Sequence, residues 1–203
     1  MSQAPVRRIA LATDLKDHSA ALFGHCLALA LHARAELFLV HIIDGGLAET
    51  SWRDLPTVRS LVEKWGAVRP EATAEEFAAL GMRVHPLDYA PTDGDTRLAV
   101  LRRVADLKPD LVVMGTHSRH GFDRMMMPSV SEDVVRDVHR ATLFVPAESR
   151  GFVDLDTGRI GIRRVMIPIS SEVAQQPLID ELTRLLTAFD VGTCSFTFVH
   201  VGS

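Results

Sequence analysis

The chain has 203 residues, of which 47% are hydrophobic and 24% are charged, and its formal net charge is −4. This length suits one large domain or one domain plus a fragment, and the hydrophobic content is too high for a disordered chain. The small negative charge excludes the overall basic field on which nucleic-acid binding depends. We therefore expect no nucleic-acid partner.

The apolar segments, the N-terminus and the cysteines indicate where the protein is located. The most apolar region, 22–43, is interrupted by charged residues and histidines, so it cannot span a bilayer. The N-terminus lacks the apolar core of a secretory signal. Cys26 and Cys194 follow no spacing motif and are expected to be buried thiols in a reducing compartment. These features predict a cytoplasmic protein with no membrane partner.

Strand patterns alternate with helix patterns through the first 150 residues. Short apolar or alternating runs predict five strands, at 9–13, 37–43, 82–89, 111–114 and 141–145. Amphipathic spacing predicts helices between them, at 19–32, 52–65, 73–80, 96–107 and 130–138. Because crossovers between parallel strands are right-handed, residues 1–150 are expected to form an α/β domain, a doubly wound, Rossmann-like, five-stranded parallel sheet.

Ligands of such sheets bind beyond the carboxyl ends of the strands, near the reversal of strand order. Asp14 and His41 lie at predicted strand ends, and 115–118 begins the loop after the fourth strand. A loop that contains Gly and joins a strand to a helix can hold phosphate through its free N–H groups. We therefore expect these three segments to converge on one crevice.

A partial second repeat follows a polar linker at 151–162. Residues 163–170 echo 7–14, a helix is predicted from Pro177, and 196–201 echoes 38–42. This order indicates an internal duplication, with 163–203 as strand, helix and strand. Either the chain is a truncated tandem protein, or the half-domain packs on the first domain or exchanges with another chain. Both alternatives leave unpaired strand edges, which favour association.

These residues resemble the universal stress protein family over about 6–147, and again from 163. The resemblance rests on five signatures, at 12–14, 40–41, 110–115, 129–135 and 141–146. It implies an adenine nucleotide alpha hydrolase-like domain that acts in the stress response. It also implies a homodimer through the last strand of the first domain, or pairing with a second repeat. The family includes ATP-binding members and members that have lost the ATP site.

The loop of the ATP-binding members reads Gly-x2-Gly-x9-Gly-Ser/Thr. Here the same spacing reads Gly115-x2-Ser118-x9-Pro128-Ser129, so two of the four positions match. Ser118 adds steric strain where Gly permits positive φ, and Pro128 has no N–H to donate to an anion. The loss of one charge-assisted hydrogen bond costs about 1.5–3 kcal/mol, or about 10- to 100-fold in affinity.

The resemblance places Asp14 and Val40 near the adenine and ribose of a bound nucleotide. His117 and Arg119 could hold phosphate through their side chains in place of lost backbone donors. The matched positions of His41 and His200 in the two repeats favour a role in the fold. The predicted nucleotide-binding residues are Ala12, Thr13, Asp14, Val40, His41, Gly115, His117, Ser118, Arg119, Ser129 and Val130. No metal site is expected, because His117-x2-His120 has no further ligand at a suitable spacing.

No catalytic motif occurs in the sequence, and no residue is nominated as an activated nucleophile or base. We therefore expect a stress-response binding or regulatory module with a weakened adenine-nucleotide (ATP) site, rather than an enzyme. One alternative is an interaction protein that works by dimerising and holds no ligand. A less favoured alternative is a slow ATP hydrolase.

Overall fold

The computed structural model describes residues 4–15, 18–43, 52–90, 96–116, 140–146, 149–169 and 175–200. Its main sheet has five strands in the order β3-β2-β1-β4-β5, and every pairing is parallel. The strands are β1 (Arg8–Ala12), β2 (Glu36–Ile42), β3 (Arg83–Tyr89), β4 (Leu111–Thr116) and β5 (Ala141–Pro146). The prediction of a doubly wound, parallel, five-stranded sheet is confirmed.

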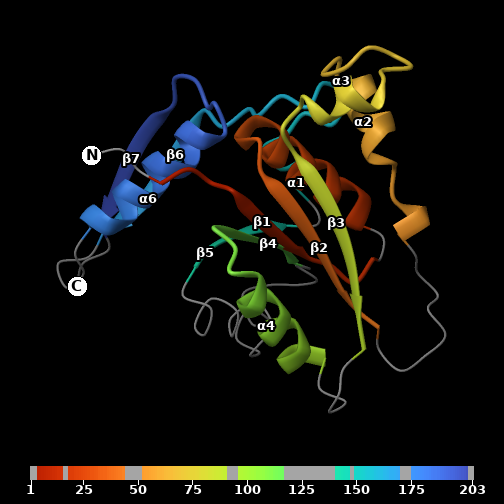
Figure 1. Cartoon of the computed structure of the whole chain (residues 1–203). Coiled ribbons are helices and arrows are strands. Elements are labelled where there is room, and N and C mark those ends of the chain that lie inside the picture. Colours follow the sequence, from red (N-terminus) through yellow and green to blue (C-terminus); the bar gives the residue numbers. More distant parts are fainter. Residues whose placement is uncertain are drawn as a thin grey trace.

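Helices cover both faces of this sheet (Figure 1). On one face lie α1 (Ser19–Ala33), α2 (Val58–Lys64) and α3 (Ala74–Ala78), and on the other lies α4 (Thr96–Leu107). Successive strand residues point to opposite faces, so Ile9 and Leu11 pack under α1 while Val112 and Met114 pack under α4. The central strands are therefore apolar on both sides, as their continuous apolar runs predict.

The helix expected at 52–65 is wrong as a single element. Residues Trp52–Asp54 form a 3₁₀ turn, η1, and α2 begins only after Thr57. Pro56 disfavours helical backbone at the residue before it, and the Thr57 side chain then caps the new helix by accepting a hydrogen bond from Ser60 N at 3.1 Å. At the start of α3, Thr73 and Glu76 form a capping box, in which each side chain accepts a hydrogen bond from the backbone N–H of the other.

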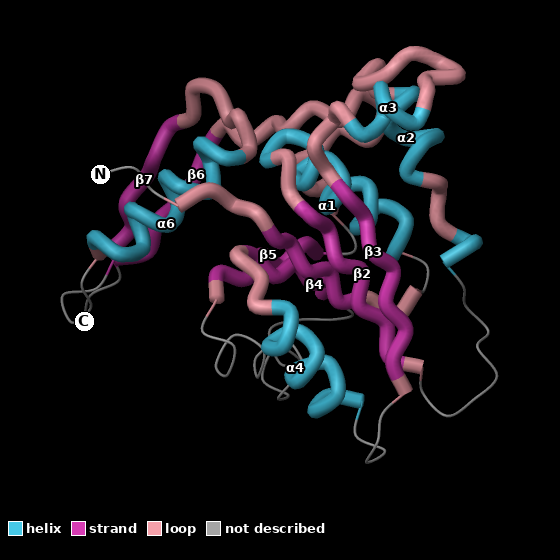
Figure 2. Tube along the Cα trace, in the orientation of Figure 1, coloured by secondary structure: helices cyan, strands magenta, loops and turns pink. Residues whose placement is uncertain are grey.

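The segment predicted to be a second repeat, here called the half-repeat, folds as strand, helix and strand. These are β6 (Arg164–Ile169), α6 (Gln176–Ala188) and β7 (Ser195–His200), and the two strands form a separate parallel sheet. Phe189, at the end of α6, is 4% exposed within the core cluster of the first domain. Arg184 Nη2 donates to the Asp110 carbonyl at 3.2 Å, just before β4. The half-repeat therefore sits at the amino end of the main sheet (Figure 2).

The two cysteines differ in burial. Cys26 on α1 is fully buried, and burial raises the pKa of its thiol. Cys194 is only partly buried, before β7, so the prediction of two buried thiols is wrong for Cys194. The difference follows from position, since α1 lies between the main sheet and other segments while β7 is mostly exposed. Within the described ranges, no helix is long and apolar enough to cross a membrane.

Candidate functional site

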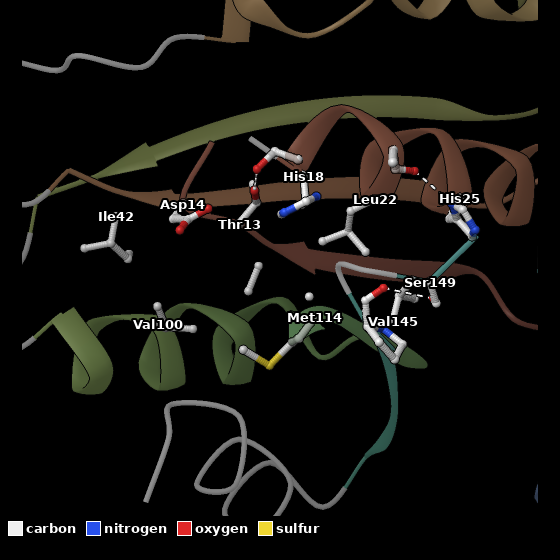
Figure 3. A pocket seen from close by; sticks show the side chains of 15 residues that line it. Thr13, Asp14, His18, Leu22, His25, Ile42, Val100, Met114, Val145 and Ser149 are labelled. Carbon is white, nitrogen blue, oxygen red and sulfur yellow. Dashed lines mark hydrogen bonds between the residues drawn. The ribbon is translucent and has the colours of Figure 1, made fainter. Parts of the chain in front are cut away.

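A cavity of about 250 Å³ opens at the carboxyl ends of β1 and β4 (Figure 3). Asp14, Ile42 and Val100 lie at one end of it, and His25 and Ser149 lie at the other. Its walls come from β1 and the loop that follows, from α1, from β4 and β5, and from the start of α4. The lining residues are Ala12, Thr13, Asp14, His18, Ser19, Ala21, Leu22, His25, Ile42, Val100, Met114, Gly115, Val145, Pro146 and Ser149.

The loop after β1 is held in place by hydrogen bonds at Thr13. Thr13 N donates to the Val40 carbonyl at 3.0 Å, which extends the pairing of β1 with β2 beyond the strand. The Thr13 hydroxyl lies 2.8 Å from the hydroxyl of Ser19 and accepts a hydrogen bond from Leu15 N at 3.1 Å. Leu15 adopts the left-handed conformation, with φ of 59°. This tight turn presents the exposed carboxylate of Asp14 at the mouth of the cavity.

One side of α1 forms the upper wall of the cavity. His18, Leu22 and His25 all line it, because positions i, i+4 and i+7 share a face of an α-helix. The sequence predicts cap chemistry at 17–19, but His18 occupies the N-cap position without a side-chain cap hydrogen bond. Ser19 faces Thr13 instead, so the start of α1 is tied to the loop after β1.

The floor of the cavity depends on the small size of Gly115. A Cβ atom at this position would lie 3.2 Å from Leu22 Cδ2, closer than an ordinary van der Waals contact. Gly115 is not among the glycines with positive φ, so backbone conformation does not require it. Its role here is to leave space between β4 and α1. Leu22 above it and Met114 beside it make this part of the cavity apolar.

His25 closes the inner end of the cavity and is only 2% exposed. Its Nδ1 lies 2.8 Å from the Ala21 carbonyl, so Nδ1 carries the proton and donates. Nε2 is buried and makes no hydrogen bond of ordinary geometry within the described ranges. Burial lowers the pKa of the imidazole. The carbonyls of Ala21 and Arg150 raise this pKa, but their effect is smaller than that of burial. A neutral ring is therefore favoured.

The structure brings four of the predicted site residues together and places two elsewhere. Ala12, Thr13, Asp14 and Gly115 line the cavity. Val40 is 1% exposed and belongs to the core beneath α4, and His41 does not line the cavity. The remaining predicted residues, His117, Ser118, Arg119, Ser129 and Val130, lie outside the described residues.

His41 faces away from the cavity because successive side chains of a strand alternate between faces. Its Nδ1 lies 3.1 Å from Asp88 Oδ1 on the adjacent strand β3. Trp52 Nε1 donates to the other carboxylate oxygen of Asp88 at 2.9 Å. The ring of Trp52 meets that of His41 edge to face, with centroids 5.8 Å apart. These contacts connect His41 to β3 and to Trp52, which is a role in the fold. The expected convergence of His41 with Asp14 on one cavity is not seen.

Sequence reasoning missed the contribution of α1 to the cavity. The signal was present, since His18, Leu22 and His25 have the spacing of one helix face and follow a strand end. Ser149 carried no comparable signal, because its place depends on how the chain turns after β5. In the part of the chain that the structure describes, no three side chains are grouped as a metal site would require.

Comparisons with known proteins find similarity over the first domain. The model of the universal stress protein family matches residues 5–146. Universal stress protein MJ0531 of Methanocaldococcus jannaschii is 27% identical over 146 residues, which are 68% of this chain and 81% of that protein. The crystal structure of a universal stress protein in complex with cAMP is 16% identical, with a TM-score of 0.47, over 71% of this chain and 100% of that one. A family member from Burkholderia pseudomallei is 25% identical, with a TM-score of 0.41, over 70% of this chain and 96% of its own.

Proposed function

Because the chain belongs to the universal stress protein family, we propose that it is a cytoplasmic stress-response binding or regulatory protein with a weakened adenine-nucleotide site, for which ATP is the leading ligand. One observation carries the proposal. A cavity lies where a doubly wound sheet binds its ligands, and Ala12, Thr13, Asp14 and Gly115 line it. The same residues belong to the strand ends that carry the family resemblance.

The lining suits the base and sugar of a nucleotide. Ala12, Ile42, Val100 and Met114 form an apolar surface on which a flat base can pack. The carboxylate of Asp14 is an acceptor for the hydroxyl groups of a ribose. The described lining contains no Lys or Arg. The phosphates of a nucleotide would therefore depend on the loop after β4, whose sequence has lost two glycines.

Binding without catalysis fits the titratable groups of the described lining. They are Asp14, His18 and His25. The Nδ1 of His25 is bonded to a backbone carbonyl and its Nε2 faces the segment after β5, so neither nitrogen serves as a base toward a ligand. The Thr13 hydroxyl lies 2.8 Å from that of Ser19 and also accepts a hydrogen bond from Leu15 N, so it is committed to the turn after β1. A slow ATP hydrolase is thus the weaker alternative.

The proposal is tested by calorimetric titration of ATP, with phosphate release followed in parallel. We expect micromolar binding without sustained turnover. Asp14→Ala should weaken binding by about 10- to 100-fold, because it removes a charged hydrogen-bond acceptor. No heat of binding at millimolar ATP would overturn the proposal. Phosphate release that disappears in Asp14→Ala would favour the hydrolase instead.

A second function, association through an exposed strand, is favoured by a separate observation. The large apolar side chains that remain exposed among the described residues all lie on β5 or in the half-repeat. They are Phe144, Met166, Leu178, Phe196 and Phe198. β5 is an edge strand of the main sheet, and β6 and β7 pair only with each other. Such edges are ready to pair with another chain. A homodimer formed through β5 or through the half-repeat is therefore the proposed assembly.

A further inference from the structure

The segment that follows β5 is a docked strap rather than an extended connection. We define the strap as residues 149–162. An antiparallel bridge joins Val153 to Ile160, and Gly161 N donates to the Phe152 carbonyl at 2.7 Å. Val153 itself is 5% exposed. The strap is thus a small hairpin with a buried side, and that side faces α1 and α2.

Three contacts fasten the middle of the strap. A Cβ at Gly24 would lie 2.7 Å from Leu155 Cδ2, so the absence of a side chain at Gly24 leaves room for this leucine against α1. The Leu155 carbonyl accepts a hydrogen bond from Trp65 Nε1 at 3.1 Å, and the backbone of Gly158 lies against the Trp65 ring. Lys64 Nζ and Asp156 Oδ1 are 2.6 Å apart, but both are exposed, so this pair adds little.

The start of the strap presses on His25. Gly151 has a φ of +64°, and a Cβ there would lie 1.9 Å from His25 Nε2. The Phe152 ring meets the imidazole edge to face, with centroids 5.2 Å apart. Ser149 belongs to the strap and lines the same end of the cavity as His25. The strap therefore closes the inner end of the cavity, and it does so by covering the unpartnered nitrogen of His25.

We propose that the strap is a latch on α1, which holds the His25 end of the cavity closed at neutral pH and releases when the imidazole of His25 takes up a proton. In the docked strap, a proton on Nε2 places a cation among the backbone of Gly151, the ring of Phe152 and α1, where the carbonyl of Arg150 offsets only part of the cost of burial. Release exposes the ring to water, where the cation is solvated. The device acts on the empty protein and needs no ligand.

The direction of the pH dependence follows from the two states of His25. Its pKa in the docked state is lowered from 6.5, chiefly by burial, whereas a released strap returns the ring to water and its ordinary pKa. The released state therefore binds the proton more tightly. Docking is at full strength above about pH 6.5 and weakens as the pH falls below it toward the lowered pKa.

The other charged groups around the strap do not share this behaviour. They are Lys64 on α2 and Arg150, Asp154, Asp156 and Arg159 in the strap itself. Carboxyl, amino and guanidinium groups ordinarily change charge far from the range in which an imidazole titrates. From α1, His25 faces the Ala21 carbonyl and, across the cavity lining, His18. His32, also on α1, is the competing source of pH dependence, since burial lowers its pKa beside Asp190 of the half-repeat.

Trp65 is a built-in reporter of the latch, because, of the two tryptophans in the chain, it is Trp65 that bonds to the strap, whereas Trp52 bonds to Asp88 on β3. The experiment uses the full chain with Trp52→Phe, so that all emission comes from Trp65. Its emission is followed from about pH 8 to about pH 5, the interval in which a histidine titrates. We expect a shift to longer wavelength with a midpoint below 6.5, while far-ultraviolet circular dichroism stays constant.

Variants assign the transition to His25. In the same background, His25→Phe should abolish the shift and His32→Gln should leave it in place. If His25→Phe does not fold, His25→Gln serves the same purpose, since it also cannot titrate. A shift that survives in either His25 variant, or its absence from the Trp52→Phe protein, would overturn the proposal.

The strap side of the latch gives an independent check. In Gly151→Ala, the added Cβ would clash with His25 and the alanine would have to adopt a positive φ. Trp65 emission should therefore already be shifted at about pH 8. Gly192→Ala is the matched control, because a Cβ there meets nothing within 4 Å, and its emission should stay that of the docked strap. Equal emission from the two alanine variants at this pH would contradict the latch.

Discussion

At the scale of single residues, the proposed nucleotide site combines retained and altered positions. Thr13 and Asp14 sit in a turn fixed by hydrogen bonds, and Gly115 leaves the space that a side chain would close. Ser118 and Pro128 stand where the ATP-binding members of the family have glycine. In this proposal, the residues expected around the base and sugar are present, while the sequence predicts weakened contacts to phosphate. The expected affinity is limited by the loop and not by the cavity.

Restoring both glycines tests whether the loop, and not the cavity, limits the affinity for ATP. Ser118→Gly with Pro128→Gly returns one backbone donor and removes steric strain, so ATP should bind about 10- to 100-fold more tightly. Calorimetry against the wild-type chain measures the change. Pro70→Gly is a matched control, because Pro70 is exposed between α2 and α3, away from the cavity, and its affinity should not change. Unaltered affinity in the double variant would show that the loop does not contact phosphate.

At the scale of elements, α6 anchors the half-repeat to the first domain. The helix contributes Phe189 to the core of the first domain, and Glu181 holds Arg184 in a pair that also reaches the Asp110 carbonyl. Asp110 in turn accepts hydrogen bonds from Arg7 N and Arg8 N at 2.8 and 3.0 Å. The half-repeat is therefore anchored to the junction of β1 and β4 and does not stand alone.

Removal of the Phe189 side chain tests that anchor. Phe189→Ala should lower the free energy of unfolding by about 3–5 kcal/mol, the usual cost of truncating a buried phenylalanine. Leu178→Ala, on the same helix but 47% exposed, should change it by no more than about 0.5 kcal/mol. Chemical denaturation measures both values. Similar small losses in the two variants would mean that α6 is not part of the first domain's core.

The elements show how far the sequence predicts this fold and where prediction stops. The strands and most helices follow from apolar periodicity, because burial on one or both faces leaves a regular pattern, as in β1 and β4. The break at Pro56 was missed because the apolar pattern continues through it while the backbone cannot. The docking of the strap was missed because it depends on shape, with Leu155 over Gly24 and Gly151 over His25, and shape leaves no periodic signal.

The candidate site was predicted in part for the same reason. Strand ends identify Ala12, Thr13, Asp14 and Gly115, since all parallel strands end at one edge. The alternation of strand faces, applied to β2, would have separated His41 from Val40 before the structure was known. His25 and Ser149 come together through the packing of the strap against α1, which leaves no periodic pattern in the sequence.

At the scale of the whole molecule, the cavity and the half-repeat lie at opposite ends of the main sheet. The carboxyl end holds the cavity, and the amino end carries the half-repeat, so an assembly through β6 and β7 would leave the cavity open. Among the described residues, the large exposed apolar side chains lie on β5 and on the half-repeat, so these are the proposed surfaces for association. The proposed ligand site and the half-repeat thus lie on separate parts of the chain, whereas β5 borders the cavity through Val145 and Pro146.

Sedimentation equilibrium tests the association and locates it. We expect wild-type chains to self-associate, because unpaired strand edges that carry exposed Phe side chains favour pairing. Phe198→Asp should shift the equilibrium toward monomer if the half-repeat is the interface, and Phe144→Asp should do so if β5 is. A wild-type chain that stays monomeric at high concentration would remove association as a function.

The central claim is that an adenine nucleotide occupies the cavity beside α1, and one comparison tests it most directly. Ala20 and Ala21 are both exposed on α1, but only Ala21 lines the cavity. Ala20→Glu and Ala21→Glu therefore change net charge equally and differ in where the carboxylate lies. Calorimetric titration of ATP should show Ala21→Glu binding about 10-fold or more weakly than wild type, a loss of about 1.4 kcal/mol, and Ala20→Glu binding nearly as wild type. Equal affinity in the two variants, or no binding of ATP to the wild-type chain, would contradict the claim.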